Sequence, residues 1–160
     1  MIKECMLAAA GLAGGFLIAS YTKNESLYRM EVSLDKFTSY FHLFDQWMLL
    51  RKAQVSLSGL FLERSIHTIA IYGMGKMANH LVEELRDTDI TVSYAIDRQK
   101  RVSEKQLEIY RTDESLPPVD AVVVTTVYDF EQIYRLLKKQ GIDNIISLED
   151  ILFCWTKERV

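Results

Sequence analysis

The chain has 160 residues, of which 49% are hydrophobic and 26% charged, a balance that indicates a folded protein and excludes an intrinsically disordered one. A net charge of −3 gives no support for a nucleic-acid-binding surface. The two cysteines, Cys5 and Cys154, are too few for a disulfide framework and fit a reducing compartment.

An uncharged apolar segment covers residues 5–21. A helix of this length spans roughly 25 Å, slightly less than the ~30 Å hydrocarbon core of a bilayer. Its three glycines weaken a helix in water but are common where helices pack in lipid. We therefore expect a single-pass membrane anchor; a buried or interfacial helix is one alternative. A cleaved signal peptide is another, although Lys3 followed by Glu4 makes a poor positive region for one.

Residues 33–63 show an amphipathic helical pattern without proline and with Gly59 as their one glycine. Apolar residues alternate at spacings of three and four, and Tyr40 and Trp47 widen the stripe that they form: Leu34, Phe37, Phe41, Phe44 and Met48. Ser33 stands where an N-cap is expected. The stripe predicts either packing of this helix on its own domain or a short coiled-coil seam for self-association.

After residue 65, short apolar runs typical of buried parallel strands alternate with helical stretches. Strands are expected at residues 67–72, 91–96, 107–110, 120–126 and 144–147, with helices at 74–86 and after Asp129. Asp129 and Gln132 have the spacing of a capping box, Gly141 is expected to end that helix, and Ser147 and Asp150 repeat the capping spacing. Right-handed crossovers then predict an α/β fold, a Rossmann-like parallel sheet of about five strands in the order 3-2-1-4-5. The expected segments are a hydrophobic anchor at 1–24, an amphipathic helical region at 25–64 and a Rossmann-like domain at 65–160.

A glycine-rich loop follows the first strand and has the pattern G-x-G-x-x-A, from Gly73 to Ala78. The first glycine suits a tight turn, the second lets a phosphate approach the backbone, and the helix that starts there presents N–H groups to an anion. Asp97 ends the next strand, where a carboxylate can bind ribose hydroxyls and would repel a 2′-phosphate, which favours NAD over NADP. The alternative is a loop that only tightens the turn between strand and helix.

The candidate nucleotide-binding residues follow from this placement. Basic residues after Asp97 could neutralise a phosphate, and two threonines end the fourth strand beside the expected cleft. The full set is Gly73, Met74, Gly75, Lys76, Met77, Asp97, Arg98, Thr125 and Thr126, with Lys100 and Arg101 as further basic residues of the turn.

Signatures of catalysis are sparse in the sequence. His42, His67 and His80 are scattered, so no metal site is expected. Tyr134 and Lys138 have the Tyr-x-x-x-Lys spacing of short-chain dehydrogenases, but they follow the fourth strand and no suitable serine precedes them. No catalytic residue is assigned, and an oxidoreductase or epimerase-like subunit would need another chain to supply its substrate site.

Four stretches together carry a resemblance to a group of proteins: I-A-I-Y-G-M-G, Y-A-I-D, V-V-V-T-T and I-I-S-L-E-D-I-L, starting at residues 69, 94, 122 and 145. The chain resembles small Rossmann-like proteins of bacterial cell-surface polysaccharide clusters, and its G-x-G and I-D pattern is similar to the nucleotide-sugar-binding domains of bacterial sugar acyltransferases. The resemblance covers roughly residues 37–152. It implies that Gly73, Gly75 and Asp97 bind NAD or a nucleotide sugar.

We therefore expect a membrane-tethered accessory of surface-polysaccharide synthesis that is anchored by residues 5–21. The Rossmann-like domain is expected on the cytoplasmic side, because cationic residues follow the segment and such residues stay on that side of the membrane. The alternative is a non-catalytic interaction or oligomerisation module with an inert glycine loop. Residues 34–48 would then contact a second copy or a polysaccharide-synthesis partner.

Overall fold

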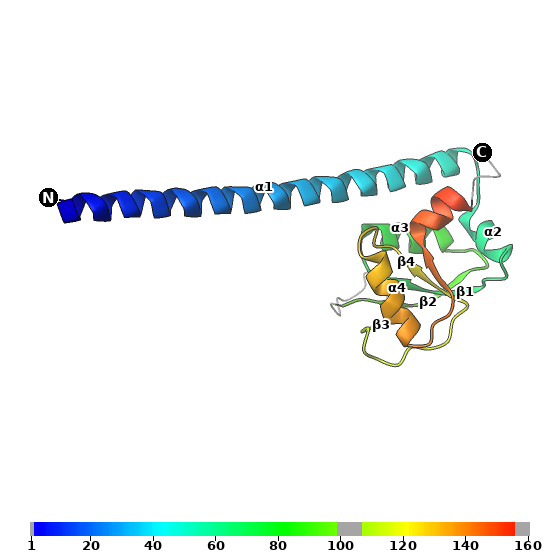
Figure 1. Ribbon diagram of the computed structural model, residues 1–160. Helices are drawn as coiled ribbons and strands as arrows, with labels where there is room; N and C mark the ends of the chain where they lie inside the picture. Colours follow the sequence, from blue (N-terminus) through cyan, green and yellow to red (C-terminus); the bar gives the residue numbers. More distant parts are fainter. Residues whose placement is uncertain (1, 99–106, 156–160) are drawn as a thin grey trace. The chain divides into compact units, whose positions relative to one another are not determined.

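The structure is a computed structural model that describes the backbone of residues 2–98 and 107–155, and the side chains of residues 27–98 and 107–155 (Figure 1). The chain divides into two compact units, Met1–Ser39 and Tyr40–Val160. A single helix, α1 (Ile2–Lys52), runs across residue 24, where the sequence suggested that the anchor segment ends. The sequence explains this continuity, because residues 16–58 contain neither proline nor glycine.

Ser33 lies inside α1, so its predicted role as an N-cap is wrong. Its hydroxyl donates to the carbonyl of Arg29, one turn earlier, at 2.7 Å. At its other end, the helix stops at Lys52. Gln54, two residues later, adopts a left-handed conformation with φ 58°. The N–H of Val55 donates to the carbonyl of Leu50, which closes the helix end.

Part of α1 packs on the domain, but not through the predicted stripe. The buried residues are Leu43, Trp47 and Leu50, whereas Phe41 is 59% exposed. Trp47, expected to widen the stripe, belongs to the core instead. The sequence pattern continued to residue 63, but a separate short helix, α2 (Leu57–Leu62), follows α1, and Ser56 accepts the Gly59 N–H at its start.

The five-stranded parallel sheet has the predicted order β3-β2-β1-β4-β5. Its strands are β1 (Thr68–Tyr72), β2 (Thr91–Ile96), β3 (Ile109–Tyr110), β4 (Ala121–Val124) and β5 (Ile145–Ser147). Every residue of β4 is buried, as expected for a central parallel strand covered on both faces. The α/β fold class is therefore confirmed.

Helices cover both faces of the sheet. One face packs on α2, α3 (Lys76–Leu85), η1 (a π-helical turn, Asp150–Cys154) and the buried residues near the end of α1. The other face packs on α4 (Phe130–Lys139) through Ile133 and Leu137. Helices α3 and α4 follow neighbouring strands onto opposite faces, so β1 and β4 form the switch point of the sheet.

The ends of α4 differ partly from the sequence prediction. Asp129 precedes the helix but has a left-handed φ of 71° and makes no side-chain cap hydrogen bond, so the predicted capping box with Gln132 is wrong. Gly141 follows the helix with φ 84°, and the N–H of Ile142 donates to the carbonyl of Leu137, as a glycine-terminated helix requires.

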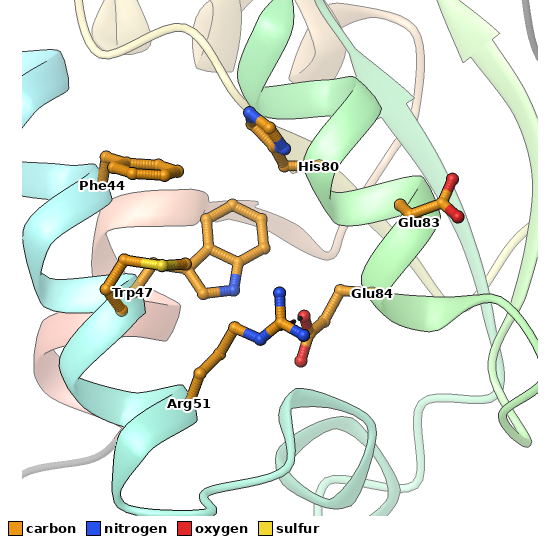
Figure 2. A pocket seen from close by; sticks show the side chains of 7 residues that line it. Phe44, Trp47, Arg51, His80, Glu83 and Glu84 are labelled. Atoms are coloured by element: carbon orange, nitrogen blue, oxygen red, sulfur yellow. Dashed lines mark ion pairs between the residues drawn. The ribbon is translucent and has the colours of Figure 1, made fainter.

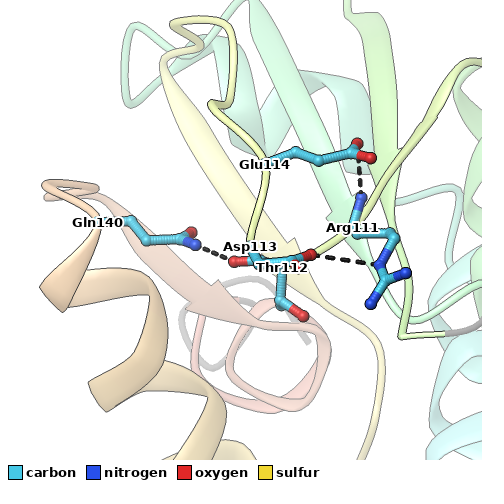
Figure 3. A network of polar contacts seen from close by, with 5 residues as sticks. All are labelled: Arg111, Thr112, Asp113, Glu114 and Gln140. Atoms are coloured by element: carbon cyan, nitrogen blue, oxygen red, sulfur yellow. Dashed lines mark hydrogen bonds and ion pairs between the residues drawn. The ribbon is translucent and has the colours of Figure 1, made fainter.

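A network of polar contacts holds the loop after β3 (Figure 3). Arg111 donates its backbone N–H to Glu114 and pairs through its guanidinium with Asp113, at 3.2 Å. Gln140, at the end of α4, donates to the carbonyl of Thr112. These contacts fasten the long connection between β3 and β4 to the helix on that face of the sheet.

Candidate functional site

The glycine loop lies at the carboxyl edge of the sheet, between β1 and α3. Its neighbours are the end of β2, which carries Asp97, and the end of β4, which carries Thr125 and Thr126. Ligands of open parallel sheets bind in this place, outside the carboxyl ends of the strands at the switch point.

Gly73 is required by the fold itself. It has φ 90°, a conformation that a side chain rarely tolerates, and a Cβ at this position would lie 2.7 Å from Cγ2 of Thr126. Its N–H donates to the carbonyl of Ile96, which ties the turn to β2. The conformation and the close contact together explain glycine here without reference to any ligand.

The Asp97 carboxylate faces the glycine loop. Its Oδ2 accepts a hydrogen bond from the backbone N–H of Met74 at 2.8 Å. A carboxylate offers about four acceptor positions, so it can hold the loop and also accept from ligand hydroxyls. The structure thus brings together Asp97 and the loop, as the sequence predicted for a ribose site.

Gly75 differs from Gly73 because the described part of the chain does not require a glycine there. Its φ of −96° is open to any residue, and a Cβ added to it would meet no described atom within 4 Å. Gly75 is also the N-cap of α3 and has no side chain to cap the helix. The first hydrogen bond of α3 runs from the N–H of Asn79 to the carbonyl of Gly75, so the three preceding N–H groups lack an acceptor within the helix.

Two threonines at the end of β4 have different roles. Thr125 is buried, and its hydroxyl lies 2.7 Å from the carbonyl oxygen of Gly73 and 3.1 Å from that of Tyr72. It therefore clamps β4 to the glycine loop. The hydroxyl oxygen of Thr126 is buried and has no hydrogen-bond partner among the described residues. A buried hydroxyl without a partner calls for an explanation, and Thr126 borders the cavity described next.

A cavity of about 250 Å³ opens at the carboxyl ends of β4 and β5. It is lined by both threonines, by Leu43 of α1, by Ser147 at the end of β5, and by Glu149 and Asp150 after it. Ser147 accepts the N–H of Asp150 at 2.9 Å, as predicted from their spacing. The lining residues carry negative charge and hydroxyl groups but no lysine or arginine, so the cavity is better suited to a hydroxyl-rich group than to a phosphate.

The other predicted residues occupy varied positions. Lys76 is exposed at the first position of α3, and Arg98 is exposed after Asp97. The Met77 side chain is 6% exposed and belongs to the core, so only its backbone can reach a ligand. Lys100 and Arg101 lie outside the described residues.

Sequence reasoning missed two features. The hydroxyl of Tyr72, the last residue of β1, is buried and also has no partner among the described residues. Its place at the carboxyl end of a central strand was a usable signal.

The second feature is a pocket of about 210 Å³ between the end of α1 and α3 (Figure 2). In this pocket His80 faces Phe44 and Trp47. Arg51 pairs there with Glu84 at 3.5 Å. No sequence motif indicated this pocket.

Neither a metal site nor a membrane-spanning helix is found among the described residues. Within the described residues, no group of three or more His, Cys, Asp or Glu side chains could hold a metal ion. Nor does any helix, over the residues whose side chains are described, combine the length and apolarity needed to cross a bilayer; the side chains of the expected anchor at 5–21 lie outside those residues. Comparison of the chain with protein-family models, with curated proteins and with solved structures gives no match.

Proposed function

We propose that the domain binds a nucleotide or nucleotide sugar at the glycine loop. The observation that carries this proposal is Gly75, a glycine at the start of α3 where the described chain leaves open space beside the backbone. A phosphate needs such close access to the first N–H groups of a helix, whose dipole also attracts negative charge.

The strand order suggests how the ligand lies. Asp97 follows β2 on one side of the loop and would accept the ribose hydroxyls, while Lys76 and Met77 would present their N–H groups to the phosphates. The cavity beyond β4 lies on the other side of the loop, where Thr126 and Ser147 offer hydroxyl groups to a sugar or other second moiety. The carboxylates of the cavity repel a phosphate, whereas the start of α3 attracts one. The phosphate would therefore lie at the helix start, and the neutral part of the ligand would lie in the cavity.

Two parts of the proposal rest on sequence alone. The role as an accessory of surface-polysaccharide synthesis comes from the resemblance in the four sequence stretches. The membrane tether, with the domain on the cytoplasmic side, comes from the apolar segment at 5–21 and the cationic residues that follow it.

Calorimetric titration of the full chain with NAD, UDP and UDP-sugars tests the proposal. At least one of these ligands should bind with a dissociation constant below about 1 mM. Asp97→Asn keeps an acceptor for the Met74 N–H but loses the charge that ribose hydroxyls favour, so binding should weaken at least about tenfold. Asp89→Asn, an exposed change before the opposite end of β2, is the matched control. Failure of all ligands to bind, or equal binding by the Asp97 and Asp89 variants, would contradict the proposal.

A second function, as an interaction module, is favoured by the stripe on α1. All of its residues are exposed: Leu34, Phe37, Phe41, Phe44 and Met48. Contiguous exposed apolar side chains of this extent are typical of interaction sites. This function does not exclude nucleotide binding, because the stripe and the glycine loop are built from different residues.

A further inference from the structure

The stripe on α1 is longer than the sequence pattern at first indicated. Leu27 and Met30 precede Leu34 at the same alternation of three and four, and both are more than half exposed. The complete stripe has seven exposed apolar residues: Leu27, Met30, Leu34, Phe37, Phe41, Phe44 and Met48. A strict alternation of three and four is the pattern of a coiled-coil seam.

The stripe lies on a different side of α1 from the face that packs on the domain. At about 100° per residue, the mean directions of the stripe and of Leu43, Trp47 and Leu50 differ by roughly 145°. The domain therefore covers the face that carries Leu43, Trp47 and Leu50, while Phe44, near the end of the stripe, lies beside His80 and is still 39% exposed.

We propose that the stripe is the seam of a parallel two-stranded coiled coil formed with a second copy of this chain. The proposal deepens the interaction function and is independent of nucleotide binding. The stripe occupies only the two positions of each seven-residue repeat that are apolar in a coiled coil. A stripe this narrow fits a contact with one helix of the same pitch better than it fits a broad groove.

The area that the stripe offers is sufficient for a dimer. Seven large side chains that are between 38% and 73% exposed present roughly 700 Å² per copy, or about 1,400 Å² in total. Stable and specific interfaces bury about 1,200–2,000 Å².

The charges beside the stripe favour the parallel orientation. In a parallel pair, Ser33 faces Thr38 of the second copy and Tyr40 faces its Asp45, so no like charges meet. In an antiparallel pair, the flank that carries Glu31 and Asp45 faces itself, and these carboxylates would repel each other. The orientation of the seam is thus set by its acidic flank.

The same charges argue against a membrane surface as the occupant of the stripe. Residues 27–48 contain two cations, Arg29 and Lys36, and three anions, Glu31, Asp35 and Asp45. Helices that lie on anionic bilayers carry a polar face rich in lysine and arginine.

The seam ends at the pocket between α1 and α3. The next seam position is Arg51, whose guanidinium pairs with Glu84 of α3 at 3.5 Å (Figure 2). This ion pair turns the charge of Arg51 toward its own domain. Phe44 and Met48 line the same pocket, so the last layers of the seam lie beside it.

Disulfide cross-linking of the full chain tests the parallel seam. In a background of Cys5→Ser and Cys154→Ser, Phe37→Cys places a thiol at a seam position, where identical residues meet in a parallel pair. Lys36→Cys, the neighbouring exposed position off the seam, is the matched control. Mild oxidation should give a covalent dimer from Phe37→Cys in at least about tenfold higher yield than from Lys36→Cys. Equal yields, or no dimer from Phe37→Cys, would overturn the proposal.

Sedimentation of the full chain gives a second readout that does not depend on cysteine. Phe37→Glu combined with Phe41→Glu should raise the dimer dissociation constant at least about 100-fold while the helical content stays unchanged, because neither side chain belongs to the core. Lys36→Glu should leave the dimer intact. A dimer that survives the double substitution, or a wild-type chain that is monomeric, would refute the seam. Ligand titration is unaffected by either result, so failure of the dimer and failure of nucleotide binding can be told apart.

Discussion

The two ends of the parallel sheet each hold a carboxylate against backbone N–H groups, but they are built differently. At the amino end, Asp120 accepts from His67 at 2.9 Å and Thr68 at 2.7 Å, and Asn144 donates to its carbonyl. At the carboxyl end, Asp97 accepts from the Met74 N–H of the loop, Gly75 borders open space, and the Thr126 hydroxyl lacks a partner among the described residues.

This difference separates groups that hold strands together from groups that can receive a ligand. The amino-end contacts join β1, β4 and the start of β5, and their donors and acceptors satisfy one another. The carboxyl end keeps a helix start and a buried hydroxyl that the described chain does not satisfy. Substitutions at the two ends should therefore affect different properties.

The largest expected effect is that of Gly73→Ala. The added Cβ meets Cγ2 of Thr126 at 2.7 Å and φ is 90°, so unfolding free energy should fall by about 2–4 kcal/mol in denaturant titrations. Gly141→Ala is the control, because φ is 84° there but no described atom lies within 4 Å; its cost should be about 1 kcal/mol. Adding Thr126→Ser to Gly73→Ala should restore part of the loss. Equal costs for the two glycine substitutions would disprove the close contact at Gly73.

Thr125→Val should have a smaller effect, a loss of about 1 kcal/mol in unfolding free energy. The hydroxyl contacts with the Tyr72 and Gly73 carbonyls disappear, but both carbonyls keep a backbone donor. Thr125→Ser retains the hydroxyl and should be close to wild type. If valine and serine behaved alike, the clamp between β4 and the loop would not contribute to stability.

The smallest effect concerns pH. Hydrogen bonds from the His67 and Thr68 N–H groups lower the pKa of Asp120 in the folded chain. The stability that this carboxylate contributes is fully present above its unfolded pKa near 4 and is lost as pH falls through the lower folded value. Asp120→Asn should therefore flatten the decline in unfolding midpoint from about pH 6 to pH 2. An unchanged pH profile would show that Asp120 is not charged in this contact.

The sheet and the loop were predictable because their signals are local. Buried parallel strands read as short apolar runs, and Gly73 and Asp97 each follow such a run directly, so strand order and the placement of the acid beside the loop followed from the sequence. Thr125 was placed correctly but not its role, because a hydroxyl at a strand end can face a ligand or a neighbouring carbonyl equally well.

The packing of α1 was not predictable because the helix has two apolar faces. Phe41 and its stripe give the stronger periodic signal, yet the domain covers Trp47 and Leu50 instead. Periodicity identifies an apolar face but does not say which surface covers it. Similarly, Asp129 has the sequence spacing of a capping residue. Its backbone is left-handed, however, and its side chain makes no hydrogen bond to the start of α4.

The central claim, that Gly75 opens the start of α3 to a phosphate, is tested most directly by nuclear magnetic resonance of the backbone amides during titration with NAD and then a UDP-sugar. Whichever of these ligands binds should shift the amide signals of Lys76 and Met77. The amide signals of His67 and Thr68, at the amino end of the sheet, should not move. Gly75→Ala should cost about 1 kcal/mol of unfolding free energy, as alanine usually does at an N-cap, leave the chain folded and abolish the shifts. Unmoved Lys76 and Met77 signals, or the same shifts in Gly75→Ala, would contradict the account.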